Sequence, residues 1–121
     1  MKYMLLIHDE EAAWTKLTDA DRLKLMGEYR QLVAELKGNG QYVTGSQLQP
    51  TSAATSVRVR NGKRTVTDGP FAETREQLGG YFLVDVANLD EALAIAARIP
   101  SARFGTVEVR PLVESAVPAA M

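Results

Sequence analysis

Cysteine is absent from the 121 residues, and histidine occurs only once, at His8. Without cysteine the chain forms no disulfide, no thiolate nucleophile and no cysteine-ligated metal site. A single histidine cannot supply the common zinc ligand sets either. The acidic run from His8 to Glu11 is typical of a solvated loop. We therefore predict no metal site and no cofactor.

A basic surplus is also missing, because 14 basic and 15 acidic side chains leave a formal net charge of −1. Nucleic-acid binders usually carry such a surplus on one face, so no nucleic-acid partner is expected. The apolar run Tyr3–Ile7 is too short for a signal segment or a membrane span. These absences predict a cytoplasmic protein that does not contact a membrane.

Phosphate-binding glycine motifs are missing as well. The glycines of GNG and GG lack the spacing of a P-loop or a dinucleotide fingerprint. The serines stand beside no base and in no elbow motif, so a serine nucleophile is not predicted.

The apolar residues that are present recur with the periods of strands and helices. Lys2–His8 is a short apolar run closed by acidic residues, as expected of a buried strand. Thr18 and Asp21 resemble a capping box at the start of a helix, and the glycines of GNG at 38–40 end it. The apolar stripe of this helix is predicted at Leu25, Met26, Tyr29, Leu32, Val33 and Leu36.

The second half of the chain repeats this order. Residues 80–87, GYFLVDVA, alternate as a strand, and residues 105–113, GTVEVRPLV, form a last strand. Between them, Asn88 with Glu91 forms a capping box for a second helix, which Pro100 stops. The buried stripe of this helix is predicted at Leu89, Ala92, Leu93 and Ala96.

A hairpin separates the two halves. Asn61-Gly62 is a pair favoured in type I′ turns, and a two-residue loop there places Val57 opposite Val66. After the first helix, QYVTG at 41–45 is predicted to be a short strand. Removing the hairpin therefore leaves two β-α-β halves. The predicted fold is therefore α+β, a ferredoxin-like split sheet with an inserted β-hairpin.

Residues 1–113 are predicted to form one domain, and residues 114–121 a flexible tail. Two helices cover only one face of such a sheet, yet the first strand is apolar on both faces. Exposed apolar patches of this size are rare in monomers. We therefore predict a homodimer that packs through the second sheet face.

The loop after the hairpin is unusually elaborate for a connection. Asp68 begins a tight turn, and Phe71 is expected to anchor the loop on the core. Thr74 is a candidate N-cap for one helical turn that ends at Gln77. The loop is either a rigid structural element or a ligand site, since sites often lie on loops held by a scaffold.

If the loop is a site, Asp68 is the first candidate for a proton acceptor and Arg75 for the anchor of an anionic group. His8 is either an idle histidine at a strand end or a general acid/base. Tyr29 either packs in the core or points its hydroxyl into a cleft. The candidate catalytic residues are thus Asp68 and His8. The candidate ligand-binding residues are Arg75, Glu73, Glu76, Tyr29 and Phe71.

Residues 68–100, DGPFAETREQLGGYFLVDVANLDEALAIAARIP, resemble the YCII-related bacterial proteins of the DGPF subgroup. MKYMLLIHDEE and GEYRQLVAELKGNGQYVTGSQLQP extend this resemblance over residues 1–113. It implies a dimeric α+β barrel. The histidine of the His–Asp pair of broader YCII relatives lies on the first helix, where this chain has Glu28 and Tyr29, so that pair is not carried over.

Two functions remain open at this point. One is an enzyme or binder that holds a small, anionic molecule in a cleft next to the loop that begins with DGPF at 68–71 (the DGPF loop). Its chemistry would be acid–base catalysis of the lyase or isomerase type. The other is a non-catalytic accessory or regulatory dimer. The resemblance implies an association of the latter with an extracytoplasmic-function sigma factor.

Overall fold

A computed structural model describes residues 1–114 of the chain, so most of the predicted tail 114–121 lies outside the described residues. The main elements are β1 (Lys2–Asp9), α1 (Glu11–Thr15), α2 (Asp19–Gly38), β2 (Tyr42–Gln47), β3 (Thr55–Arg60), β4 (Lys63–Asp68), β5 (Gln77–Asp85), α3 (Leu89–Arg98) and β6 (Thr106–Pro111). Two 3₁₀ turns, η1 (Thr51–Ala53) and η2 (Pro100–Arg103), complete the described chain.

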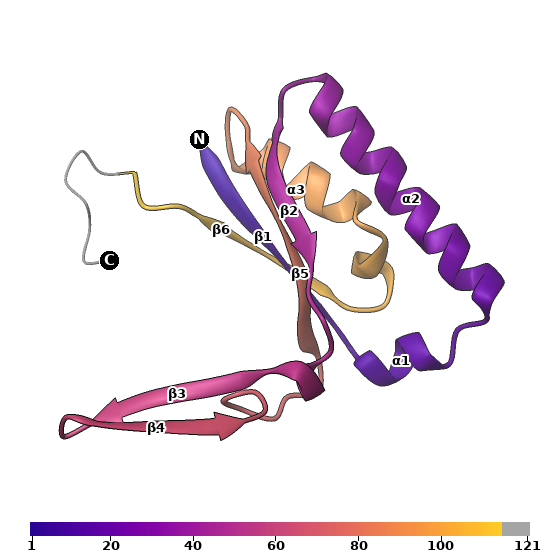
Figure 1. Cartoon of the computed structure of the whole chain (residues 1–121). Helices are drawn as coiled ribbons and strands as arrows, with labels where there is room; N and C mark the ends of the chain where they lie inside the picture. Colours follow the sequence, from indigo (N-terminus) through magenta and orange to yellow (C-terminus); the bar gives the residue numbers. More distant parts are fainter. Residues whose placement is uncertain (115–121) are drawn as a thin grey trace.

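The main sheet is antiparallel, with strand order β2-β5-β1-β6. Helices α2 and α3 lie side by side on one face of this sheet, as Figure 1 shows. Helix α2 connects β1 to β2, and helix α3 connects β5 to β6. In each case one strand of the other half lies between the two connected strands. This is the split β-α-β arrangement, and the α+β prediction is confirmed. None of the helices in residues 1–114 is long and apolar enough to cross a membrane.

Local capping fixes where the long helix begins. The Thr18 hydroxyl accepts from the Asp21 amide at 3.1 Å, and the Asp21 carboxylate accepts from the Thr18 amide at 3.3 Å. The predicted capping box is therefore present. The helix ends at Gly38, and Gly40 takes a positive φ of 77° just beyond it.

Helix α3 begins as predicted but buries a different stripe. The Asn88 side chain caps the Glu91 amide at 3.0 Å. Leu89 and Leu93, which were predicted to be buried, are 47% and 46% exposed, so that part of the prediction is wrong. The buried residues are Ala92, Ile95 and Ala96, followed by Ile99. These four also have three- and four-residue spacing, and they place two large isoleucines against the sheet between small alanines.

The alternation of β1 sends Tyr3, Leu5 and Ile7 into the core between sheet and helices. Leu5 pairs with Phe82 of β5, which faces the same layer. The strand extends one residue beyond the predicted His8, and this last residue, Asp9, has the inward register. Asp9 is only 5% exposed, which makes it the exceptional charged residue of this face.

The hairpin β3–β4 projects away from the body, with its tip far from the helices (Figure 1). Val57 pairs with Val66, as predicted. Asn61 and Gly62 both have positive φ, 53° and 74°, as a type I′ turn requires.

The loop between β4 and β5 differs from its prediction. Phe71 is 82% exposed and anchors nothing, because the loop at the base of a projecting hairpin has no core surface beside it. Thr74 caps no helical turn either. Its hydroxyl donates to the Glu76 carbonyl at 2.6 Å, and Gln77 already begins β5.

Candidate functional site

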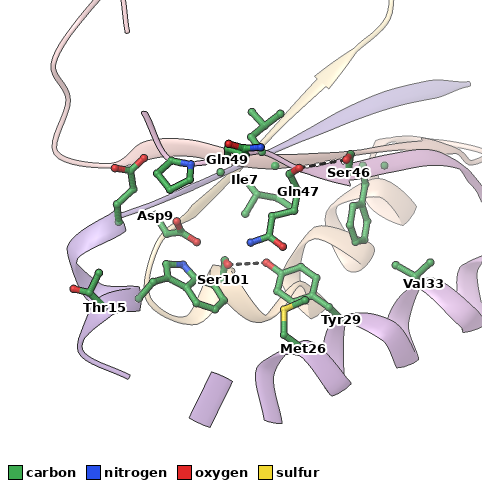
Figure 2. A pocket seen from close by; sticks show the side chains of 18 of the residues that line it. Ile7, Asp9, Thr15, Met26, Tyr29, Val33, Ser46, Gln47, Gln49 and Ser101 are labelled. Atoms are coloured by element: carbon green, nitrogen blue, oxygen red, sulfur yellow. Dashed lines mark hydrogen bonds between the residues drawn. The ribbon is translucent and has the colours of Figure 1, made fainter. Parts of the chain in front are cut away.

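A pocket of about 520 Å³ lies between the helix-covered face of the sheet, helix α2 and the short helix α1 (Figure 2). Its volume is within the usual range for small-molecule sites. Most of the side chains around it are apolar or aromatic, among them Ile7, Trp14, Met26, Tyr42 and Phe82. Among residues 1–114, no lysine, arginine or histidine lines it.

Asp9 is the buried charge of this pocket. Its carboxylate has no hydrogen-bond partner among residues 1–114, although the residue is only 5% exposed. Figure 2 shows it pointing into the space that Tyr29 and Ser101 also face. Its oxygens are not among the fully buried unpaired atoms of residues 1–114, so they are reached from the pocket space.

Two glycines lie against Asp9, and one of them is required for space. A methyl group added at Gly79 of β5 would stand 3.4 Å from Asp9 Oδ1. At Gly105, just before β6, an added methyl group would stand 2.9 Å from Asp9 Cβ and 2.2 Å from the His8 carbonyl oxygen. Since Cβ atoms do not approach other atoms that closely, the space around Asp9 depends on glycine at position 105.

Tyr29 and Ser101 form a pair of hydroxyl groups in the same pocket. Tyr29 Oη and Ser101 Oγ are 2.6 Å apart, and Ser101 is fully buried in η2. Burial raises the pKa of the Tyr29 phenol above its usual value, and the negative charge of Asp9 raises it further. The phenol therefore stays protonated at neutral pH. The ring packs edge-on against Phe82, with 6.3 Å between centroids.

Two more polar side chains reach the pocket, with different roles. Glu11 is occupied, because Thr51 donates to it twice, from the amide at 2.7 Å and from the hydroxyl at 3.0 Å. Gln47, at the end of β2, points its amide toward Tyr29 and Ser101 (Figure 2). Asp9 is thus the lining carboxylate that is left for a ligand.

The sequence comparisons now place the chain in a family. Residues 1–116 match the YCII-related domain. The chain belongs to the YCII-related family. An uncharacterized protein of Rhizobium meliloti (strain 1021) is 38% identical over 117 residues, which cover 93% of this chain and 92% of that protein. Neither comparison names an activity, so the chemistry of this YCII-related protein has to be argued from its own pocket.

Of the residues predicted to form a site, the structure brings only Tyr29 to the pocket. His8 lies on the opposite face of the sheet, with its Nε2 3.7 Å from a Glu108 oxygen and without a hydrogen bond among the described residues. Asp68 ends β4 at the base of the hairpin and is exposed. Arg75 is 90% exposed and its Nε donates to Glu10 at 3.0 Å.

The other loop residues also lie apart from the pocket. Phe71 and Glu73 are exposed. Glu76 accepts from the Thr106 hydroxyl at 2.9 Å. The three charged loop residues named as ligand-binding candidates, Glu73, Arg75 and Glu76, therefore share no common site: each contacts a different element or none.

The YCII-related chain shows no group of three His, Asp or Glu side chains that could hold a metal within residues 1–114.

Sequence reasoning missed Asp9 and Ser101. A signal for Asp9 was available, because it continues the inward series of Tyr3, Leu5 and Ile7 by one more alternation. A charge at such a position indicates either a buried ion pair or a site. Ser101 had no comparable signal, since only the tertiary fold brings η2 to α2.

Proposed function

We propose that the pocket of this YCII-related protein binds a small, mostly apolar organic molecule, and that Asp9 accepts a hydrogen bond or a proton from its polar group. The observation that carries the proposal is the buried Asp9 carboxylate, which has no hydrogen-bond partner among residues 1–114 and borders a ligand-sized space. A few convergent polar groups in a mostly apolar pocket are typical of small-molecule sites.

The neighbouring groups support acid–base chemistry of the lyase or isomerase type. Asp9 is the proton acceptor, and the protonated Tyr29 hydroxyl is a donor for an oxygen atom on which negative charge develops. Ser101 holds the Tyr29 hydroxyl in place through the 2.6 Å contact. In this proposal, the role predicted for Asp68 and His8 passes to Asp9 and Tyr29.

The charge of the pocket argues against the anionic ligand predicted from Arg75. In the described part of the chain no basic side chain lines the space, and Arg75 is bonded to Glu10 on the surface. An anionic ligand would be repelled by Asp9 and would find no counter-ion there. An anion site at the DGPF loop remains a separate prediction.

A thermal-shift screen with a library of small organic molecules tests the binding function. Compounds that bind the native pocket raise the melting temperature by mass action. We expect hits that stabilise the wild-type protein and the Asp68→Asn variant alike, and that lose most of this effect in Asp9→Asn. Hits that depend on Asp68 and not on Asp9 would locate the site in the loop and contradict the proposal.

A second candidate is a non-catalytic homodimer with an accessory or regulatory role. One observation favours the dimer: the sheet face without helices carries a central patch of half-buried Met4, Leu6, Tyr81 and Leu83. In a two-fold dimer this patch would pack against its own copy. Here the DGPF loop would contact a partner, for which the resemblance suggests a sigma factor. Asp68→Ala would then change assembly or partner binding but no turnover.

A further inference from the structure

We infer that the ligand of the Asp9 pocket is a primary organic amine that binds as its ammonium form, with an apolar body of about the size of an indole ring. The inference rests on the proposed binding function and adds the charge and the shape of the ligand. Three features of the lining carry it: its charge, its acceptors and its aromatic walls.

The charge of the lining is negative and unbalanced. Among the lining residues the charged side chains are Asp9 and Glu11. Glu11 has both oxygens occupied by Thr51, whereas the Asp9 carboxylate has no hydrogen-bond partner among residues 1–114. Arg103 acts on Tyr29 from nearby, but it is paired with Glu28 at 2.6 Å and does not line the pocket. A ligand cation is therefore the missing counter-charge.

An ammonium group offsets the desolvation of Asp9 better than the alternatives. A neutral hydroxyl would satisfy one lone pair of the carboxylate but leave its charge uncompensated. A ligand carboxylate would place a like charge beside it, which is unfavourable at low dielectric. Hydrogen bonds between an ammonium and a carboxylate are the stronger, charge-assisted kind.

The number of acceptors fits a primary amine. An ammonium group of this kind has three N–H donors. Figure 2 shows Asp9, the Gln47 amide and the Tyr29–Ser101 hydroxyl pair directed toward one space. The carboxylate, the amide oxygen and a hydroxyl lone pair together supply three acceptors.

Aromatic rings form the remaining walls. Trp14, Tyr29 and Phe82 line the pocket, and cations bind favourably to the faces of such rings. A further lining ring, Tyr42, already has Lys37 Nζ 5.6 Å from its centre. Trp14 is held by an edge-on contact with Phe104, with 5.9 Å between ring centroids. The 520 Å³ volume accommodates a bicyclic body beside the ammonium group.

Three probes with the same ring separate the ligand classes: tryptamine, tryptophol and indole-3-acetate carry an ammonium, a hydroxyl and a carboxylate. Their dissociation constants are measured by calorimetry at neutral pH on the wild-type protein. We expect tryptamine to bind at least about tenfold more tightly than tryptophol, because a charge-assisted hydrogen bond is stronger than a neutral one by about this factor. Indole-3-acetate should bind most weakly.

The Asp9→Asn variant should lose about tenfold or more of the tryptamine affinity and with it the preference over tryptophol. Asp68→Asn, which changes an exposed carboxylate outside the pocket, is the matched control and should bind like the wild type. The ranking on the wild-type protein tests the inference even if Asp9→Asn does not fold.

Two results would overturn it. Tryptophol or indole-3-acetate binding as tightly as tryptamine, and in dependence on Asp9, would refute the amine class and leave the binding function intact. If none of the three probes bound at millimolar concentration, both the amine class and the proposed pocket function would fail.

Discussion

At the scale of single residues, the site depends on which face of a strand each side chain occupies. Asp9 and His8 are neighbours in β1, yet Asp9 faces the pocket and His8 the opposite side of the sheet. The alternation of side chains along β1 accounts for both orientations. It also could have located Asp9, whereas the exposure of Phe71 depends on the direction of the whole hairpin and had no local signal.

Gly105→Ala should destabilise the protein by about 1–3 kcal/mol, because the new methyl group would collide with the His8 carbonyl at 2.2 Å. Urea unfolding measures this change. Gly27→Ala is the matched control: it lies within α2 with nothing within 4 Å of the added Cβ, and should stabilise by roughly 0.5–1 kcal/mol. Equal effects at both glycines would contradict the close approach at Gly105.

The buried Tyr29 phenol leads to a prediction about the stability of the protein at alkaline pH. Burial raises its pKa in the folded protein, so the neutral phenol is favoured by folding. The contribution of the neutral phenol to the free energy of unfolding is fully present below the ordinary tyrosine pKa of about 10. It is lost as the pH rises through the higher pKa of Tyr29 in the folded protein.

When the wild-type protein is titrated with base, the tyrosinate absorbance should therefore include a component that appears at a higher pH than the others. The Tyr29→Phe variant should lack this component. The free energy of unfolding should also fall less steeply above pH 10 in that variant. A difference titration that places Tyr29 at or below the ordinary value would refute its burial beside Asp9.

At the scale of elements, the helices and turns with their own local signals were predictable. The capping box at Thr18 and the Asn61-Gly62 turn are formed by residues close in sequence, so both were found. The five-residue helix α1 was not, because it is too short to show a period. The stripe of α3 was assigned incorrectly because two overlapping stripes have the same spacing, and only contact with the sheet selects one.

Thr18→Ala should lower the free energy of unfolding by about 1 kcal/mol, since it removes the acceptor for the Asp21 amide. Chemical denaturation followed by circular dichroism gives the value. Ser52→Ala, at an exposed hydroxyl in η1, should change little. A loss at Ser52 as large as at Thr18 would argue against a capping role.

At the scale of the whole molecule, the order of strands and helices was enough to predict a split sheet with both helices on one face. The pocket could not be predicted in this way. It forms where β1, α2, η2 and the end of β2 meet, and these segments are far apart in sequence. Of the segment from Asp68 to Gly80, Gly79 and Gly80 line this space, and both belong to β5 and not to the loop.

The uncovered sheet face leads to a prediction about assembly. If a second copy covers the patch around Leu6, Leu6→Lys should convert a dimer into a monomer, because it buries a charge at the interface. Light scattering after size exclusion reports the mass. Leu23→Lys, on the exposed face of α2 at 70% exposure, should leave the mass unchanged. A wild-type protein that is monomeric at micromolar concentration would contradict the dimer.

The central claim is that Asp9, and not the loop of Asp68 and Arg75, marks the ligand site. Amide chemical shifts of the labelled protein, followed while tryptamine is added, test it most directly. We predict that the largest shifts cluster at Asp9, Tyr29 and Gln47. Shifts confined to the loop around Asp68 and Arg75, or no shifts at saturating probe, would contradict the account.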